Sequence, residues 1–143
     1  VINPEMIQEV ISIFFEDETV TFGSLKKEIT DPDEIKATST VKVVTDQKGD
    51  AMYFSRSKIP FERNEGKADF YGHLGIYGYK RDALIRMTEL PQSSYEQAES
   101  LEQLRALQNG MKIKTSIVDF IPVGIDTAED LEKFKNIISA NTV

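Results

Sequence analysis

Cysteine is absent from this sequence, and histidine occurs only once. The lack of cysteine excludes disulfide bonds and thiolate metal sites. A single imidazole cannot build a zinc site unless carboxylates supply most of the ligands. Gly-rich phosphate loops, Gly-x-Ser-x-Gly and His-Glu-x-x-His are missing as well. Several common signatures of nucleotide binding, serine hydrolysis and zinc proteolysis are therefore excluded.

Positive charge is also in deficit. The chain carries 17 Lys and Arg against 24 Asp and Glu, a net charge of −7. Because nucleic-acid binding depends on a cationic surface, this balance argues against a nucleic-acid partner. A small anionic ligand would need a locally basic pocket. No apolar run is long enough to span a bilayer and no secretion signal is recognisable, so we expect no membrane partner.

The pattern of apolar residues predicts an α/β sheet. The 143 residues can bury a core, and no repeat, low-complexity tract or linker divides them, so we expect a single domain over 1–143. Predicted helices cover 4–17, 81–90, 94–109 and 128–139, with at most a helical turn at 33–37. Predicted strands cover 19–29, 41–45, 51–55, 70–79 and 112–119. Gly49 provides the turn of a hairpin formed by the second and third strands.

The predicted strand 70–79 concentrates unusual residues, since it holds the single histidine and three of the five tyrosines. Alternation places His73, Tyr77 and the other tyrosines on one face of the strand. Its glycines indicate the close approach of another backbone or of a ligand. The strand is either part of a ligand site or an aromatic strand of the core whose histidine has its hydrogen bonds satisfied.

Polar residues elsewhere leave similar alternatives open. Arg56 follows the aromatic strand 51–55 and is either a fork for a ligand carboxylate or a surface arginine. Asp126 precedes the last helix and is either a magnesium ligand or a plain N-cap. Glu102 and Gln103 lie on the predicted helix 94–109 and would ordinarily be solvated.

Four motifs in one order resemble a known enzyme family. They are Tyr53-Phe-Ser-Arg-Ser-Lys-Ile-Pro60, His73-Leu-Gly-Ile-Tyr-Gly-Tyr79, Ser100-Leu-Glu-Gln-Leu-Arg-Ala-Leu-Gln-Asn-Gly110 and Gly124-Ile-Asp-Thr-Ala-Glu-Asp-Leu131. Together they resemble the 3-deoxy-manno-octulosonate (Kdo) cytidylyltransferases, or CMP-Kdo synthetases, of lipopolysaccharide synthesis. The resemblance implies a magnesium-requiring enzyme that joins Kdo to CMP, consumes CTP and releases pyrophosphate. It also implies a cytoplasmic homodimer with a Rossmann-like sheet and a smaller antiparallel sheet at the sugar site and the dimer contact.

The resemblance assigns roles motif by motif. Arg56 is similar to the residue that meets the Kdo carboxylate, and His73 and Tyr77 to a sugar-facing pair. Glu102 and Gln103 are similar to contacts of the sugar hydroxyls. Asp126 is similar to the second magnesium-binding aspartate of the family, in a Gly-Val-Asp-Thr motif, and so to a catalytic residue.

Two family segments have no counterpart in this chain: the basic loop that holds the CTP phosphates, and the Gln-Gly-Asp-Glu-Pro segment whose aspartate is the first magnesium ligand. We therefore expect the chain to correspond to the C-terminal portion of the family, to lack most of the CTP site and to be inactive alone. Residues 37–40 also depart from the usual Asp-Pro-Asn lead-in. Two alternatives remain: a cytidylyltransferase for another 2-keto sugar acid, such as amino-Kdo or sialic acid, and a non-catalytic sugar-acid-binding or dimerisation module.

Overall fold

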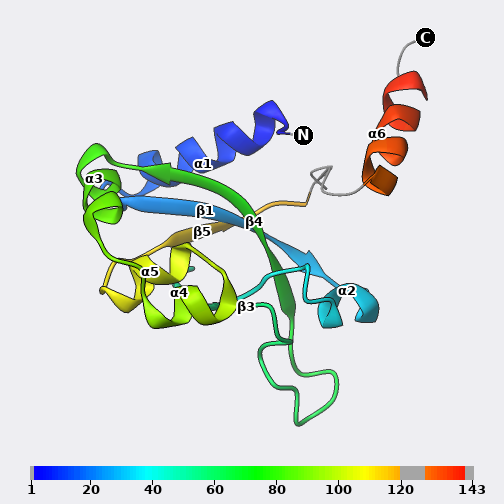
Figure 1. Cartoon of the computed structure of the whole chain (residues 1–143), viewed down its shortest axis with the longest axis horizontal. Helices are drawn as coiled ribbons and strands as arrows, with labels where there is room; N and C mark the ends of the chain where they lie inside the picture. Colours follow the sequence, from blue (N-terminus) through cyan, green and yellow to red (C-terminus); the bar gives the residue numbers. More distant parts are fainter. Residues whose placement is uncertain (1, 120–127, 141–143) are drawn as a thin grey trace.

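The computed structural model describes residues 2–119 and 128–140. Its centre is one five-stranded sheet in the order β3-β2-β4-β1-β5 (Figure 1). The strands are β1 (Phe22–Ile29), β2 (Lys42–Thr45), β3 (Ala51–Ser55), β4 (Phe70–Tyr79) and β5 (Lys114–Ile117). The pairs β1–β4, β2–β3 and β2–β4 are antiparallel, and β1–β5 is parallel. The predicted α/β class is confirmed, but the described strands form one mixed sheet and no separate smaller sheet.

Helix α1 (Pro4–Glu16) covers one face of the sheet. Asn3 caps it by accepting a hydrogen bond from the Glu5 N–H, and proline follows at the first helical position, as the sequence predicts. Its buried residues pack against Leu25 and Leu74 in one apolar cluster, which contains Met6, Val10, Ile13, Val20 and Val118. The spacing of these residues produces the amphipathic face that the sheet buries.

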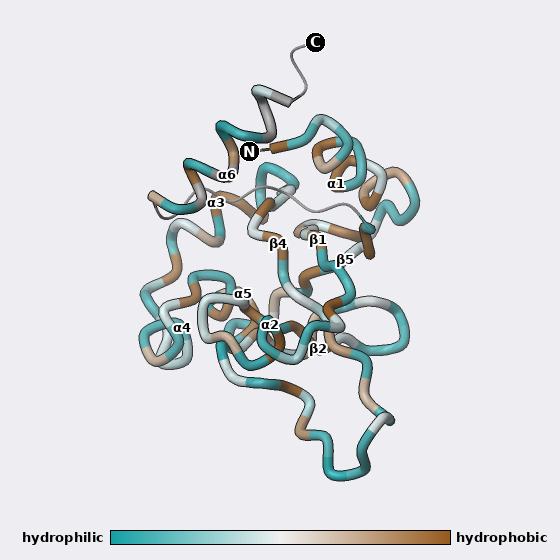
Figure 2. The backbone as a smooth tube through the Cα atoms, turned by 90° about the vertical axis from the view of Figure 1, so that its right-hand side faces the viewer, coloured by the Kyte–Doolittle hydropathy of each residue, from teal (hydrophilic) through white to brown (hydrophobic). Residues whose placement is uncertain are grey.

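Helices α3 (Arg81–Glu89), α4 (Ser94–Glu99) and α5 (Gln103–Gln108) belong to the opposite layer. The larger apolar cluster lies there and includes Phe22, Val43, Phe54, Met87, Leu101, Leu104 and Ile113. In the view of Figure 2, the strands run between α1 on one side and α4 and α5 on the other. Tyr71, Tyr77 and Tyr79 pack against this cluster, so the aromatic face of β4 points toward α4 and α5.

Two features shape the ends of the sheet. Short helix α2 (Pro32–Lys36) closes one end, where Ile35 packs on Ile29 and Phe70. At the other end the two edge strands, β3 and β5, approach each other. The Ala51 N–H donates to the Ile113 carbonyl at 2.8 Å, and the backbones of Asp50 and Lys114 form an isolated antiparallel β-bridge. The last helix, α6 (Ala128–Ala140), lies to one side of the two layers in Figure 1. No helix in the described part of the chain is long and apolar enough to cross a membrane.

One predicted element is wrong. The sequence predicts a single helix over 94–109, whereas the structure has two, α4 and α5. The chain turns at Ser100, whose φ of 54° and ψ of 50° are left-handed. A left-handed residue cannot continue a right-handed helix, so the helical hydrogen bonding stops there.

Candidate functional site

A β-bulge in β4 organises the candidate site. Ser24 of β1 pairs with Tyr77, but its neighbour Leu25 pairs with Leu74, so β4 carries two extra residues at this point. The Ser24 hydroxyl fills the irregularity by donating to the carbonyl oxygens of Ile76 at 2.8 Å and Leu74 at 3.2 Å. Because the bulge adds an even number of residues, His73 and Tyr77 remain on one face. Bulges commonly redirect side chains next to active sites.

His73 is held as a neutral imidazole beneath α5. Its Nε2 lies 2.8 Å from Ser24 Oγ, and its Nδ1 lies 3.4 Å from the Gln103 amide nitrogen. The Ser24 hydroxyl donates its single hydrogen to backbone carbonyls, so its oxygen accepts a hydrogen bond from the imidazole. We therefore assign the ring proton to Nε2 and the lone pair to Nδ1, which accepts from Gln103. Phe54 packs edge-on at 4.7 Å between ring centroids. Burial lowers the pKa of His73 to about 4.

Tyr77 and Tyr79 continue the aromatic face beyond His73. Tyr77 lies 5.5 Å from the imidazole and 6.3 Å from Tyr79, measured between ring centroids. Burial raises the pKa of Tyr77, with the Tyr79 phenol and the Glu102 carboxylate adding to the effect. Burial, with help from Glu102, also raises the pKa of Tyr79 to about 12. Both phenols therefore stay protonated near neutral pH and can donate a hydrogen bond to a ligand.

Arg56 follows β3 and is partly buried. Its guanidinium donates to three carbonyl oxygens: Glu99 at 2.8 Å, Thr38 at 3.1 Å and Ser100 at 3.4 Å. All three acceptors are neutral, and no ion pair found among residues 2–119 and 128–140 includes Arg56. Arginine has five N–H donors, so one N–H on each terminal nitrogen remains for another acceptor. A guanidinium with N–H groups left over can bind a carboxylate.

Glu99, the last residue of α4, holds the backbone around Arg56. One carboxylate oxygen accepts from the Ser55 hydroxyl at 2.6 Å, and the other accepts from the Arg56 N–H at 2.9 Å. Burial alone would raise the pKa of Glu99, but these hydrogen bonds, together with the Tyr53 hydroxyl and the Arg56 charge, hold that pKa below its usual value. Glu99 is therefore an anion at neutral pH.

Gln103 and Glu102 begin α5 beside the aromatic face. Gln103 is buried and reaches His73, whereas the side chain of Glu102 is 74% exposed. The Glu102 carboxylate contributes to the raised pKa of both Tyr77 and Tyr79. The structure thus brings His73, Tyr77, Glu102 and Gln103 together, and it places Arg56 at the adjacent α4–α5 junction.

A bidentate ion pair holds α5 against α4. Arg105 of α5 donates through Nε and Nη2 to the two oxygens of Glu96 in α4, at 2.8 and 2.5 Å. Glu96 also accepts from the Ser93 N–H and so completes a capping box at the start of α4. Because both partners are largely shielded, removing either one would leave a buried charge without compensation. The pair therefore fixes α5, which begins with Gln103, relative to α4.

Asp126 lies outside the described residues, so its role as a magnesium ligand or an N-cap stays a prediction. Within the ranges that the structure describes, no three His, Asp or Glu side chains are grouped in a way that could hold a metal ion.

Sequence reasoning missed Ser24, Lys42 and Glu99. Lys42 is fully buried, and its ammonium donates to the carbonyl oxygens of Ala37, Thr40 and Arg56. It thereby ties the loop 37–40 to Arg56. The apolar strand 41–45 is expected to be buried, and a buried lysine is almost always paired. A lysine inside this strand is therefore a sequence signal for such a contact. Ser24 and Glu99 carry no comparable signal, since their partners are distant in the sequence.

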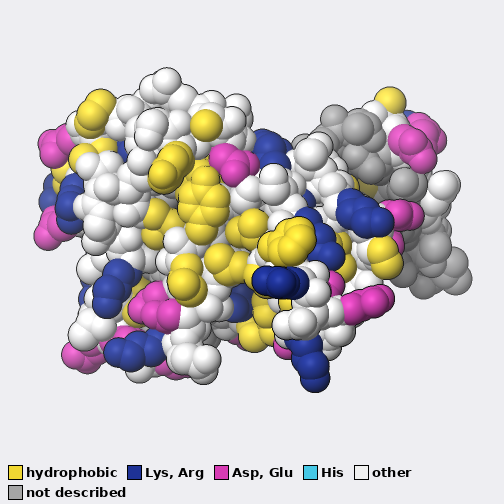
Figure 3. Space-filling view, turned by 90° about the horizontal axis from the view of Figure 1, so that it is seen from below, with side chains coloured by type: hydrophobic (Ala, Val, Ile, Leu, Met, Phe, Trp, Pro, Cys, Tyr) yellow, Lys and Arg dark blue, Asp and Glu magenta, His cyan; other side chains and the backbone are white. Residues whose placement is uncertain are grey.

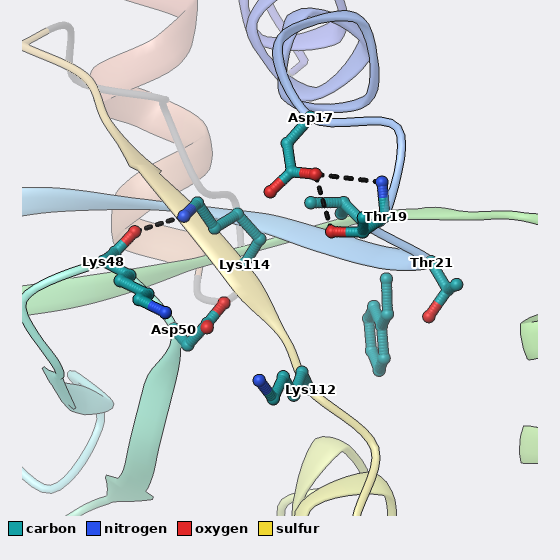
Figure 4. A pocket seen from close by; sticks show the side chains of 9 residues that line it. Asp17, Thr19, Thr21, Lys48, Asp50, Lys112 and Lys114 are labelled. Carbon is teal, nitrogen blue, oxygen red and sulfur yellow. Dashed lines mark hydrogen bonds between the residues drawn. The ribbon is translucent and has the colours of Figure 1, made fainter.

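A basic pocket is lined by a different set of residues. Figure 4 shows Lys48, Lys112 and Lys114 around a cavity of about 140 Å³, with Asp17 and Asp50 beside them. Lys114 donates to the Lys48 carbonyl oxygen, and Asp17 accepts from the Thr19 N–H and hydroxyl. Since the two aspartates offset most of the lysine charge, this pocket is a weaker anion site than Arg56.

Comparisons with known proteins point in one direction. Residues 1–113 match the family model described as cytidylyltransferase. The 3-deoxy-manno-octulosonate cytidylyltransferase of Fusobacterium nucleatum is 42% identical over 142 residues, covering 99% of this chain and 58% of that protein. The enzyme of the same name from Thermodesulfovibrio yellowstonii is 46% identical over 137 residues, covering 92% of this chain and 53% of that protein.

A solved structure agrees with these relatives. It is CMP:2-keto-3-deoxy-manno-octonic acid synthetase complexed with CTP, which superposes with a TM-score of 0.92 at 39% identity. The match covers 98% of this chain and 58% of that one. The chain therefore spans little more than half the length of the relatives it matches. These matches do not confirm the prediction that it corresponds to their C-terminal portion.

Proposed function

Because the chain belongs to the cytidylyltransferase family, we propose that the whole protein transfers a cytidylyl group from CTP to Kdo. A hydroxyl oxygen of the sugar acid attacks the α-phosphorus of CTP and its proton passes to solvent. The bond between the α-phosphorus and the oxygen bridging to the β-phosphate breaks, and pyrophosphate leaves with the electron pair. The observation that carries the proposal is the similarity over 99% of the chain to a relative named for this reaction. The CTP-bound relative supports CTP as the nucleotide.

The candidate site supplies contacts of the kind that a polyhydroxy acid needs. In the proposal Arg56 binds the sugar carboxylate through its two remaining N–H groups. Glu102 and Gln103 hydrogen-bond to sugar hydroxyls, and the Tyr77 phenol donates to the ligand. His73 contributes as a neutral group, because a pKa of about 4 makes it a poor proton donor at neutral pH. Its role is to orient Gln103 and line the sugar pocket.

Magnesium remains part of the proposal. Asp126 would be one carboxylate ligand, and substrate phosphates would supply further oxygens, as hard cations prefer. Bound there, the ion would offset the charge of the phosphate groups. We also propose a cytoplasmic homodimer, following the family resemblance.

The test is a pyrophosphate-release assay on the full-length protein with CTP and magnesium. We expect turnover with Kdo and separation of CMP-Kdo by anion exchange. Faster turnover with amino-Kdo or a sialic acid would reassign the substrate. Binding of Kdo without any pyrophosphate release would favour the non-catalytic module and contradict the proposed activity.

A further inference from the structure

The interruption between α4 and α5 releases two backbone carbonyls. In a continuous helix the carbonyl of Glu99 would accept from the Gln103 N–H, and that of Ser100 from the Leu104 N–H. The left-handed Ser100 prevents this, and the Leu104 N–H donates to the Leu101 carbonyl instead. The released carbonyls of Glu99 and Ser100 accept from the Arg56 guanidinium. The helix break thus supplies two of the three acceptors that hold this side chain.

The side chain of Glu99 also binds Arg56, through the Arg56 backbone. Its carboxylate accepts from the Arg56 backbone N–H and the Ser55 hydroxyl and makes no ion pair with the guanidinium. The Lys42 ammonium donates to the Arg56 carbonyl oxygen. The backbone and the head of Arg56 are therefore both held by hydrogen bonds, while no carboxylate among the described residues forms an ion pair with its guanidinium.

From this geometry we infer that Glu99 is the positioning residue for Arg56, holding the guanidinium in a preformed orientation for the sugar-acid carboxylate. The inference rests on the proposed function. Arginine has many rotamers, and a guanidinium already held in place loses less freedom when a ligand binds. Glu99 holds Arg56 in this orientation through its side chain and its backbone carbonyl, and in the proposal it does not contact the substrate. The exposed Glu102, three residues further along, is the ligand-facing carboxylate in the same scheme.

The experiment measures steady-state kinetics of the full-length protein carrying Glu99→Gln, with Glu89→Gln as the matched control. Glu89 ends α3 and is exposed. Glutamine keeps the size of Glu99 but presents an amide N–H₂ where one of two donors, Ser55 or Arg56, needs an acceptor. We expect the KM for Kdo to rise roughly tenfold to a hundredfold, as for a misplaced binding group. The KM for CTP should change less than about twofold, and Glu89→Gln should match the unmodified protein.

A double-mutant cycle separates positioning from general destabilisation. If Glu99 acts through Arg56, adding Glu99→Gln to Arg56→Ala should cost less than about twofold more. The inference would be overturned if the losses of the two single variants multiply in the double variant. It would also be overturned if Glu99→Gln raises both KM values equally, or if it behaves like the Glu89→Gln control. Glu99→Asp, which keeps the charge but shortens the side chain, should show the same selective rise and covers a poorly folding Gln variant.

The proposed function and the inference fail in different ways. An unmodified full-length protein without CMP-Kdo synthesis would overturn both. Normal synthesis with an Arg56→Ala variant that leaves the KM for Kdo unchanged would overturn the inference and the proposed Arg56 contact, while the proposed reaction would stand.

Discussion

His73 is a residue whose chemistry is set by its surroundings. Ser24 and Gln103 satisfy its two nitrogens, and Phe54 covers the ring, so water cannot stabilise an imidazolium. The pKa falls from 6.5 to about 4. As the only histidine of the 143 residues, it gives a single set of imidazole resonances. We expect these proton shifts to stay constant between pH 5.5 and 8 in the folded chain and to move only in more acidic buffer.

The same shift makes stability depend on pH. Between pH 6.5 and about 4, His73 is protonated in the unfolded chain but stays neutral in the folded chain. The free energy of unfolding therefore decreases as the pH falls. Each pKa unit is 1.36 kcal/mol, so the full effect is about 3 kcal/mol. Urea titrations should show that His73→Asn loses less stability than the unmodified chain between pH 7 and 4.5. Parallel pH profiles of the two proteins would contradict a buried neutral histidine.

The proposed contact between Arg56 and the sugar carboxylate can be tested by substitution. Loss of a charge-assisted forked contact costs roughly 1.5–3 kcal/mol, and 1.4 kcal/mol is a factor of ten. In the full-length protein, Arg56→Ala should lower kcat/KM for Kdo on the order of tenfold to a hundredfold, with little change in the KM for CTP. Arg56→Lys should recover only part of the loss, because an ammonium keeps the charge but not the fork. Unchanged sugar kinetics in both variants would remove Arg56 from the sugar site.

At the scale of elements, most of the fold could be predicted from local patterns. The N-cap and proline before α1, the Gly49 turn between β2 and β3, and the alternation in β4 each specify their element locally. The split of the predicted helix 94–109 could not be predicted, because Ser100 is an ordinary helix residue by propensity. What stabilises the break is non-local: Arg56, 44 positions away from Ser100, binds the released carbonyls. The β4 bulge likewise depends on Ser24 of another strand.

Packing of α1 on β4 gives a prediction with a control in the same strand. A Cβ atom on Gly78 would lie 2.6 Å from Val10 Cγ1 and 2.7 Å from Phe14 Cε2, whereas one on Gly75 would meet nothing within 4 Å. Gly78→Ala should therefore force α1 away from the sheet and cost about 1–3 kcal/mol of unfolding free energy. Gly75→Ala should stay within about 0.5 kcal/mol of the unmodified chain. Urea unfolding of both variants measures the difference, and equal midpoints would show that α1 does not press on this strand.

At the scale of the whole molecule, the candidate site depends on how the layers meet. The sequence predicts His73, Tyr77, Glu102 and Gln103 as site residues through the family resemblance, and the structure brings them together between β4 and α5. Of their supports, Ser24 and Glu99 could not be predicted and Lys42 left only a local signal, because each of the three comes from a different element. Lys42 lies on β2, Glu99 ends α4 and Ser24 lies on β1. Each of these three residues joins segments at least 14 positions apart in the sequence.

Association is the last property that the architecture helps to predict. Phe54 on β3 is unavailable for a dimer contact, since its ring is fully buried in the core of one chain. Met52, two positions earlier on the edge strand β3, is 64% exposed and Phe61 in the following loop is 88% exposed. Seen from below, the molecule shows apolar side chains gathered on a face bordered by charged ones (Figure 3). An edge strand with exposed apolar residues favours contact with another chain.

We therefore expect the full-length protein to sediment as a dimer at tens of micromolar, and Met52→Lys to weaken the dimer at least about tenfold. Burying a lysine charge without a partner in an apolar contact is unfavourable, and 1.4 kcal/mol suffices for that factor. Leu84→Lys is the matched control, because Leu84 is 45% exposed on α3, in a different part of the molecule. Sedimentation velocity over a dilution series measures both variants. A monomeric unmodified protein would contradict the proposed dimer, and equal weakening by Met52→Lys and Leu84→Lys would move the contact away from β3.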